Sequence, residues 1–114
     1  MESEELRNRL EEIYSFSKEL ENRIELIDSR IAEIESIIEN LKAVENADET
    51  LVNLGAGAFI KSSLKEKKLF VNAGAGVFVR KSISETIRIL EEQLIMLAQS
   101  KEEMKMQLEH GTSE

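Results

Sequence analysis

The long N-terminal stretch of the chain contains no glycine or proline, and its apolar side chains recur at intervals that alternate between four and three residues. This spacing lines one face of an α-helix and is typical of the a and d positions of a coiled coil. The pattern lasts for more than five heptads, with Ser17 as its single polar member. We therefore predict a coiled-coil helix over residues 1–47, with the seam positions Leu6, Leu10, Ile13, Ser17, Leu20, Ile24, Ile27, Ile31, Ile34, Ile38 and Leu41.

A second seam with the same spacing occupies the C-terminal part of the chain. The run Ser82-Ile83-Ser84-Glu85 is a capping box, which is typical of a helix start, and Gly111 is typical of a helix end. We predict a helix over residues 82–110 and a tail over residues 111–114. The seam positions of this helix are Ile83, Ile87, Leu90, Leu94, Leu97, Lys101, Met104 and Leu108.

The two seams match when the chain doubles back on itself. Pairing Leu41 with Ile83 brings every a and d position of the second helix opposite one of the first helix. Lys101 then lies opposite Ile24, where its methylene stem packs on the seam while its ammonium group reaches water. The sequence therefore predicts a long antiparallel two-helix coiled coil.

Between the helices, residues 48–81 change to a period of two, and two similar segments each contain Gly-Ala-Gly. Alternating residues rich in Val, Ile, Leu and Phe are typical of strands, and glycine supplies the positive φ that a tight hairpin turn needs. We predict two consecutive β-hairpins, with strands at residues 50–54, 58–64, 69–73 and 77–80. The whole chain, residues 1–114, is then a single domain of the α+β class.

The period of two assigns the strand side chains to two faces of a sheet, one aliphatic and one with three phenylalanines among polar residues. So small a sheet cannot bury both faces within one chain, and its edges offer unpaired hydrogen-bonding groups. We therefore expect the hairpins to join several chains. The expected oligomerisation residues are Val52, Leu54, Ile60, Leu69, Val71, Val77 and Val79, with Ala58 on the same face. The opposite face carries Phe59, Phe70 and Phe78 with Asn53, Lys61, Asn72 and Arg80.

The composition excludes several classes of partner. The formal net charge is −8, which repels the phosphates of nucleic acid and disfavours anionic membranes. The chain has no cysteine, so we expect no disulfide and no thiolate zinc site, which fits a reducing cytoplasm. We also expect no signal peptide and no membrane-spanning segment.

No motif in the sequence favours catalysis. Neither Gly-Ala-Gly opens into a helix or is followed by Gly-Lys-Ser/Thr, so both are interpreted as hairpin turns rather than phosphate-binding loops. His110 is the single histidine and lies near the end of the chain, and the carboxylates follow the solvent faces of the helices. A catalytic acid or base needs a concave site that tunes it. We predict no enzymatic activity, no catalytic or metal-binding residues and no cofactor.

One end of the predicted arm carries apolar residues that have no partner in the second helix. Exposed apolar side chains bind unfolded proteins by burying apolar surface, and methionine adapts to varied partners. Two interpretations remain open: these residues grip non-native proteins, or they continue an intermolecular coiled coil or pack within the arm. The candidate client-binding residues are Leu6, Leu10, Ile13, Tyr14, Phe16, Met104, Met106 and Leu108.

The order helix, two hairpins, helix, together with the strings 51-LVNLGAGAFI-60 and 74-GAGVFVRKSISETI-87, resembles an alpha-type subunit of the prefoldin family, of an archaeal-like kind. Beta-type subunits of that family have a single hairpin, so the second Gly-Ala-Gly segment favours the alpha type. Asn53 stands where alpha-type subunits usually have proline, and both helices are shorter than is usual in that type.

The resemblance implies a function and a set of partners. Prefoldin is an ATP-independent chaperone of the cytoplasm of archaea and eukaryotes, in which alpha-type and beta-type subunits form a hexamer. Its hairpins join into a β-barrel platform, and its coiled-coil arms hold non-native proteins and deliver them to a group II chaperonin. The implied partners of this chain are beta-type subunits, further copies of itself, non-native proteins and the chaperonin. The alternative hypothesis is a structural coiled-coil scaffold or a filament-forming prefoldin-like protein.

Overall fold

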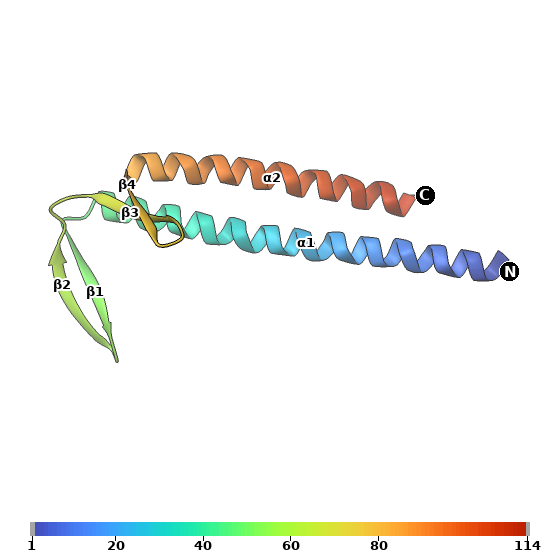
Figure 1. The fold of residues 1–114 in the computed structure, drawn as a ribbon, viewed down its shortest axis with the longest axis horizontal. Helices are drawn as coiled ribbons and strands as arrows, with labels where there is room; N and C mark the ends of the chain where they lie inside the picture. The colour runs from blue at the N-terminus through green and yellow to red at the C-terminus, as the bar shows by residue number, and fades with distance from the viewer. Residues whose placement is uncertain (1, 114) are drawn as a thin grey trace. The chain divides into compact units, whose positions relative to one another are not determined.

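The chain begins and ends with a long helix, and two β-hairpins lie between the helices in the sequence (Figure 1). The computed structural model describes residues 2–113, with side chains as far as residue 110. Its elements are α1 (Glu2–Glu45), β1 (Glu49–Gly55), β2 (Ala58–Ser63), β3 (Lys68–Gly74), β4 (Val77–Ser82) and α2 (Ile83–Ser113). The fold is of the α+β class, as the sequence predicts.

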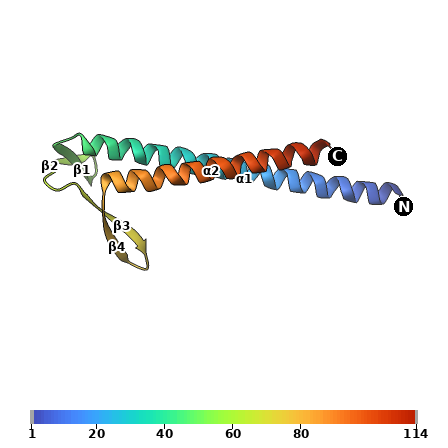
Figure 2. The same cartoon turned by 90° about the horizontal axis from the view of Figure 1, so that it is seen from above.

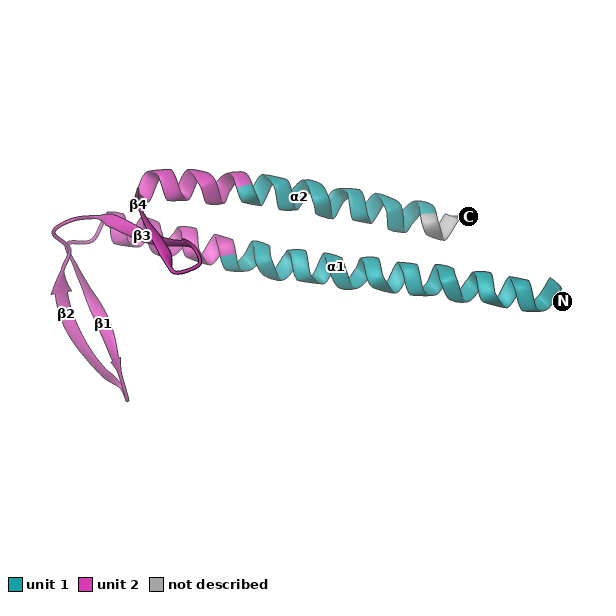
Figure 3. Ribbon diagram, viewed as in Figure 1, with its two compact units in different colours: residues 1–33, 93–114 teal, residues 34–92 magenta. Residues whose placement is uncertain are grey.

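The chain divides into two compact units (Figure 3). The arm unit consists of residues 1–33 and 93–114, and so contains the N-terminal part of α1 and the C-terminal part of α2. The hairpin unit consists of residues 34–92 and contains the end of α1, both hairpins and the start of α2. Each helix contributes to both units, so the packing of each unit is described separately.

In the arm unit, the two helices lie side by side and antiparallel (Figures 1 and 2). Leu20 is the most deeply buried residue of this unit, with 3% of its surface exposed. The half-buried residues of the predicted seam are Ser17, Ile24, Ile27 and Ile31 on α1, and Leu94, Leu97, Lys101, Met104 and Leu108 on α2. The period of burial is therefore that of the heptad pattern, which confirms these parts of the two seams.

The hairpin unit contains three of the four buried seam positions among the described residues. Ile34, Ile38 and Ile83 are 0%, 7% and 4% exposed. Leu41, Ile87 and Leu90 are half-buried beside them. Truncation of a fully buried isoleucine to alanine costs about 2–5 kcal/mol, so this aliphatic cluster is the main source of stability for the root of the two helices.

The start of α2 is fixed by Ser82, the last residue of β4. The backbone N–H of Glu85 donates to the Ser82 hydroxyl oxygen at 3.1 Å, and the Thr86 hydroxyl donates to the Ser82 carbonyl at 2.9 Å. Satisfying an otherwise unpaired N–H of the first turn is the function of an N-cap. The predicted capping serine is confirmed.

The two helices end differently at their C-termini. At the end of α1, the Lys67 ammonium group donates to the Glu45 carbonyl at 2.5 Å, which places a cation at the negative end of the helix dipole. In contrast, α2 continues to Ser113, past the helix end expected at Gly111. Glycine inside a helix costs about 1 kcal/mol relative to alanine but can adopt helical φ and ψ.

The register of each hairpin confirms the assignment of the strand faces. Val52 pairs with Ile60 in the first hairpin, and Val71 pairs with Val79 in the second. Residues opposite one another in an antiparallel pair point to the same side, so these pairs define an aliphatic face on each hairpin. The residues of alternate parity, among them Phe59, Phe70 and Phe78, lie on the other side, called here the phenylalanine face.

Within the described residues, the four strands form two separate two-stranded sheets rather than one sheet. Each hairpin pairs only its own two strands, and residues 64–67 form no ladder between them. The alternation of side chains gives the two faces of each strand, but it does not specify which strand edges meet. That choice depends on contacts beyond a single hairpin.

The two turns have the same geometry. Ala56 and Gly57 have φ of 51° and 78°, and Ala75 and Gly76 have φ of 50° and 76°. Two successive positive φ values are typical of a type I′ turn, whose twist matches that of the flanking strands. The alanine is the unexpected residue, because a side chain with a Cβ is disfavoured in the left-handed region by about 1–2 kcal/mol.

An asparagine two residues before each turn supports it. The Gly55 N–H donates to the Asn53 side-chain oxygen at 2.8 Å, and the Gly74 N–H donates to the Asn72 side-chain oxygen at 2.9 Å. In both hairpins the ladder shifts register at this point. The asparagine side chain thus accepts a hydrogen bond from the backbone at the point where the ladder becomes irregular.

We expect the double substitution Ala56→Asn and Ala75→Asn to raise the free energy of unfolding by about 1 kcal/mol per hairpin, because asparagine tolerates left-handed φ better than alanine. The matched double substitution Ala56→Val and Ala75→Val should lower it by a similar amount, because a β-branched residue is more strongly disfavoured there. Chemical unfolding at equal protein concentration, followed by circular dichroism, measures both changes. Equal stability of the valine variant and the original chain would contradict the left-handed turn geometry.

Candidate functional site

The candidate sites of the described part of the chain are surfaces of exposed apolar side chains. Over residues 2–110 no polar or charged side chain is buried, and the described residues contain no group of three or more side chains able to hold a metal ion. A separate finding is that neither of the helices, over the residues described, is long and apolar enough to cross a membrane.

The first candidate surface lies at the N-terminal end of α1 in the arm unit. Leu6 and Leu10 are 60% and 59% exposed, and Ile13 is 40% exposed, although all three occupy seam positions. In this unit the N-terminal end of α1 extends beyond the described end of α2 (Figures 1 and 2). The seam pattern therefore continues past the part of the arm in which it is buried.

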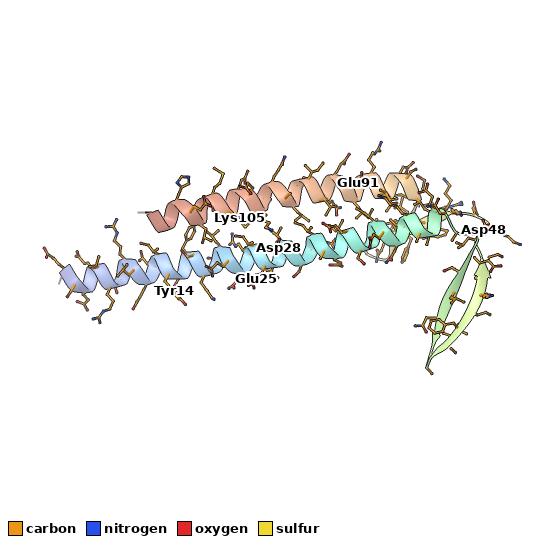
Figure 4. The ribbon with its side chains drawn as sticks, turned by 180° about the vertical axis from the view of Figure 1, so that it is seen from behind. Tyr14, Glu25, Asp28, Asp48, Glu91 and Lys105 are labelled. Atoms are coloured by element: carbon orange, nitrogen blue, oxygen red, sulfur yellow. The ribbon has the colours of Figure 1, made fainter. Side chains whose placement is uncertain are left out.

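Two aromatic residues flank this exposed seam. Tyr14 is 70% exposed and Phe16 is 51% exposed, and Tyr14 lies near the N-terminal end of α1 (Figure 4). At 100° per residue, Tyr14 and Phe16 lie on opposite sides of the line through Leu6, Leu10 and Ile13. Together these five residues, called here the tip surface, form an apolar strip wider than a single heptad seam.

The C-terminal candidates divide into two groups. Met104 and Leu108 are half-buried on the α2 seam, whereas Met106 is 51% exposed on an outer face. Met104 and Leu108 therefore pack within the arm, and only Met106 presents most of its side chain to solvent. The heptad assignment predicts the greater exposure of Met106, because position 106 does not belong to the seam.

Three exposed apolar residues of the arm unit were missed by the analysis of the sequence. Leu26, Ile95 and Met96 are 70%, 59% and 67% exposed. They lie at neither a nor d positions. The sequence does indicate their exposure, because an apolar residue outside the seam has no place in the packed interface. They are scattered along the outer surface of the arm, which is common in folded proteins.

A polar contact interrupts the apolar seam of the arm unit. The Lys101 ammonium group lies 2.5 Å from an Asp28 carboxylate oxygen, and the two side chains are 27% and 49% exposed. Asp28 follows Ile24 by one helical turn, so the lysine reaches past its expected seam neighbour to an acid on α1 (Asp28 is labelled in Figure 4). A polar side chain at an a or d position lowers the stability of a coiled coil while specifying its register.

The hairpins carry the second candidate surface, on their aliphatic faces. Val52, Leu54 and Ile60 of the first hairpin are 42%, 65% and 53% exposed. In the second hairpin Val77 and Val79 are 57% and 39% exposed, and Leu69 and Val71 are half-buried. A single chain thus leaves most of this aliphatic surface in contact with water, and exposed apolar patches of this kind mark interaction sites.

The phenylalanine faces are also exposed. Phe59, Phe70 and Phe78 are 58%, 68% and 60% exposed, and Leu51, which the assignment of faces from the sequence left out, is 60% exposed beside Phe59. On the second hairpin the Arg80 guanidinium carbon lies 5.8 Å from the centre of the Phe70 ring. This hairpin therefore has an aliphatic side and an aromatic side of different chemistry.

These features define a class of protein: an antiparallel coiled coil with two hairpins, whose described residues provide apolar binding surfaces. A model of the family "Prefoldin subunit" matches residues 3–113. Among solved structures, the chain is similar to a filamentous PFD from Methanocaldococcus jannaschii, with a TM-score of 0.77 and 16% identity over 94% of this chain and 92% of that chain. A search of curated proteins found no match.

Because the family model spans nearly the whole sequence, the chain belongs to the prefoldin family. This is a family of non-enzymatic chaperone and scaffold subunits, which assemble into oligomers with other prefoldin subunits. At 16% identity, the likeness to the filamentous structure shows the fold alone.

We expect Lys101→Met to raise the free energy of unfolding by about 1 kcal/mol, because an apolar side chain replaces a polar one on the seam. Asp28 is half exposed, so water can solvate its carboxylate once the lysine is removed. The matched control is Lys18→Met, which changes an exposed lysine outside the seam and should alter stability by less than about 0.5 kcal/mol. Thermal unfolding of both variants provides the measurement, and a lower stability of Lys101→Met than of the control would contradict this reading of the seam.

Proposed function

We propose that the chain is an alpha-type prefoldin subunit that acts as an ATP-independent holdase. The observation that carries this proposal is the tip surface, in which seam residues remain exposed at the end of a helix. A chain with apolar binding surfaces and no recognised catalytic motif is suited to holding other proteins rather than transforming them. Its clients are non-native proteins, which expose the apolar segments that a folded protein buries.

The second hairpin supports the alpha type. Beta-type subunits have one hairpin, whereas this chain has two, each with an Asn-x-Gly-Ala-Gly turn segment. The proposed assembly is a hexamer with beta-type subunits, in which the hairpins form a β-barrel platform. The residues proposed to join the subunits are Val52, Leu54, Ile60, Leu69, Val71, Val77 and Val79, and the pairing of Val52 with Ile60 and of Val71 with Val79 supports a shared aliphatic face on each hairpin.

Capture at the tip surface follows from the burial of apolar area. Each Å² of apolar surface removed from water contributes about 25 cal/mol before the cost of ordering the client. A contact with one tip is therefore weak. Several arms on one platform raise the effective concentration of binding sites around a bound client, which gives retention together with release. The proposed grip consists of Leu6, Leu10, Ile13, Tyr14 and Phe16 of α1 with Met106, which is exposed, and Met104 and Leu108, which are half-buried, of α2.

The remaining parts of the proposal concern the cellular setting. The proposed location is the cytoplasm, where the chain transfers clients to a group II chaperonin. The proposed single domain, residues 1–114, works without a cofactor, nucleic acid or membrane. The charge of −8 supports the last two points, because it opposes binding to polyanions.

A second function, assembly into a filament or scaffold, is favoured by one observation. The similar solved structure is described as filamentous, and open hairpin surfaces on each chain can join copies without closing a ring. In this alternative the hairpins still join the subunits, but the arms separate them along a polymer. The native mass distinguishes the two: a closed hexamer has one mass, whereas an open polymer grows with protein concentration.

We expect the triple substitution Leu6→Gln, Leu10→Gln and Phe16→Gln to abolish most of the holdase activity without changing the assembly. Light scattering of a chemically denatured protein, diluted in the absence of ATP, measures the suppression of aggregation. The matched control is Leu26→Gln, Ile95→Gln and Met96→Gln, which removes three apolar side chains of the same unit that are at least as exposed. Equal protection by the tip variant and the control would show that the tip surface is not the grip.

We expect Val71→Glu or Val79→Glu to dissociate the assembly while leaving the helix content largely unchanged, because an unpaired carboxylate buried in an interface is strongly unfavourable. Native mass spectrometry and far-ultraviolet circular dichroism measure the two quantities. The control is Phe78→Glu, on the opposite face of the same hairpin, which should retain the assembly. Dissociation by Phe78→Glu alone would assign the interface to the phenylalanine face instead.

A further inference from the structure

The charge of this acidic chain is distributed unevenly, and its one basic segment includes the second hairpin. Residues 61–81 contain six basic residues against the single acid Glu66, a local net charge of +5 in a chain whose total is −8. The basic residues are Lys61, Lys65, Lys67, Lys68, Arg80 and Lys81. Lys67 is used at the end of α1. Lys61, Lys65 and Lys68 make no ion pair with the side chains of residues 2–110.

Two of these cations share a face with exposed aromatic rings. The register pairs Phe70 with Arg80, Asn72 with Phe78 and Lys68 with Ser82, so these side chains point to the same side of the β3–β4 hairpin. Phe70 is 68% exposed and Phe78 is 60% exposed. We call Lys68, Phe70, Phe78 and Arg80 the aromatic-basic face. It is the part of the phenylalanine face that belongs to the second hairpin.

A carboxylate already occupies this face. A Glu66 carboxylate oxygen accepts a hydrogen bond from the Arg80 guanidinium at 2.8 Å, while the same guanidinium lies 5.8 Å from the centre of the Phe70 ring. The side chains of Arg80 and Glu66 are 56% and 72% exposed, so water and other carboxylates can compete for the pair. Glu66 thus occupies the position that an incoming acid would take, and it is held weakly enough to be displaced.

We propose that the aromatic-basic face docks an acidic protein segment in which carboxylates alternate with apolar side chains. The apolar side chains of the segment cover Phe70 and Phe78, and its carboxylates pair with Arg80 and Lys68. Charge complementarity fixes the class of partner, because an acidic segment is attracted to this face and repelled by the acidic remainder of the chain. The occupant is a protein segment rather than nucleic acid, because the net charge of −13 outside residues 61–81 opposes a long polyanion.

This inference rests on the proposed function in one respect. The aliphatic face of the hairpin is taken to join the subunits, which leaves the opposite face accessible in the assembly. The two faces of a two-stranded hairpin point in opposite directions, so a segment can dock on one while the other is buried. The tip surface is in the other unit and has no part in this contact.

The test uses the full-length chain in its native assembly and two fluorescent peptides. One peptide alternates Glu with Leu and Phe, and the other has Gln in place of every Glu. Fluorescence anisotropy should give an affinity for the acidic peptide at least about tenfold above that for the Gln peptide, and this advantage should decrease as the salt concentration rises from about 50 to about 500 mM. Equal affinities for the two peptides would overturn the proposal.

Variants locate the binding to the aromatic-basic face. Lys68→Glu with Arg80→Glu should weaken binding of the acidic peptide by about tenfold or more, because attraction becomes repulsion. Phe70→Ala should weaken it as well. The control Arg23→Glu with Arg30→Glu makes the same change of net charge on α1, in the arm unit, and should leave the affinity unchanged. An equal loss in the control would indicate a general charge effect and would overturn the assignment of the site.

Two further outcomes separate this inference from the proposed function. The Lys68→Glu, Arg80→Glu variant should keep its native mass and its suppression of aggregation, so a loss of peptide binding alone supports the docking surface. Dissociation of the assembly by this variant would show that the face is a subunit interface and would overturn the inference. Binding of single-stranded DNA with an affinity equal to that of the acidic peptide would overturn the choice of a protein partner. If the tip variant fails to alter aggregation while the peptide still binds at Arg80, the holdase proposal fails and the docking surface stands.

Discussion

Burial of aliphatic a and d side chains between two antiparallel helices is the interaction on which the remaining structure depends. The best-buried positions of the hairpin unit, Ile34, Ile38 and Ile83, have less than a tenth of their surface exposed. They lie where α1 approaches its end and α2 begins, and so they fix the two points between which the chain must form its hairpins. The hairpins themselves bury little and depend on this root, because isolated two-stranded hairpins are marginally stable in water.

The two hairpins have the same turn structure. In each, an asparagine side chain accepts a hydrogen bond from a glycine N–H at the register shift, and an Ala-Gly pair then turns the chain with positive φ. The strain of the left-handed alanine is small beside the gain from correct strand twist and pairing. Asn53 stands where alpha-type prefoldin subunits usually have proline. Its side chain accepts the same kind of hydrogen bond as that of Asn72 in the second hairpin.

The exposed apolar surfaces of the chain result from its small interior. A coiled coil of two helices and two thin hairpins has little interior, so apolar residues outside the paired part of the seam remain exposed. At the end of α1 these residues form the tip surface, and on the hairpins they form the aliphatic and phenylalanine faces. The proposed holdase and docking functions assign these different surfaces to different partners.

The sequence by itself determined the elements that depend on local periodicity. The heptad spacing predicted both helices and their buried residues, and the period of two predicted the faces on which Val71 and Phe70 lie. Ser82 was recognisable as a helix cap because its hydrogen bond is made within one turn. The exposure of the tip residues followed from counting seam positions that have no partner.

Only the tertiary structure decided the features that join residues distant in the sequence. The partner of Lys101 is Asp28, rather than water alone, because a flexible lysine can reach any acid within one turn of its seam neighbour. The Glu66–Arg80 pair depends on the path of the connector between the hairpins, and the separation of the strands into two sheets depends on which edges meet. Side-chain periodicity contains no information about any of these choices, because each is made by packing between elements rather than within one.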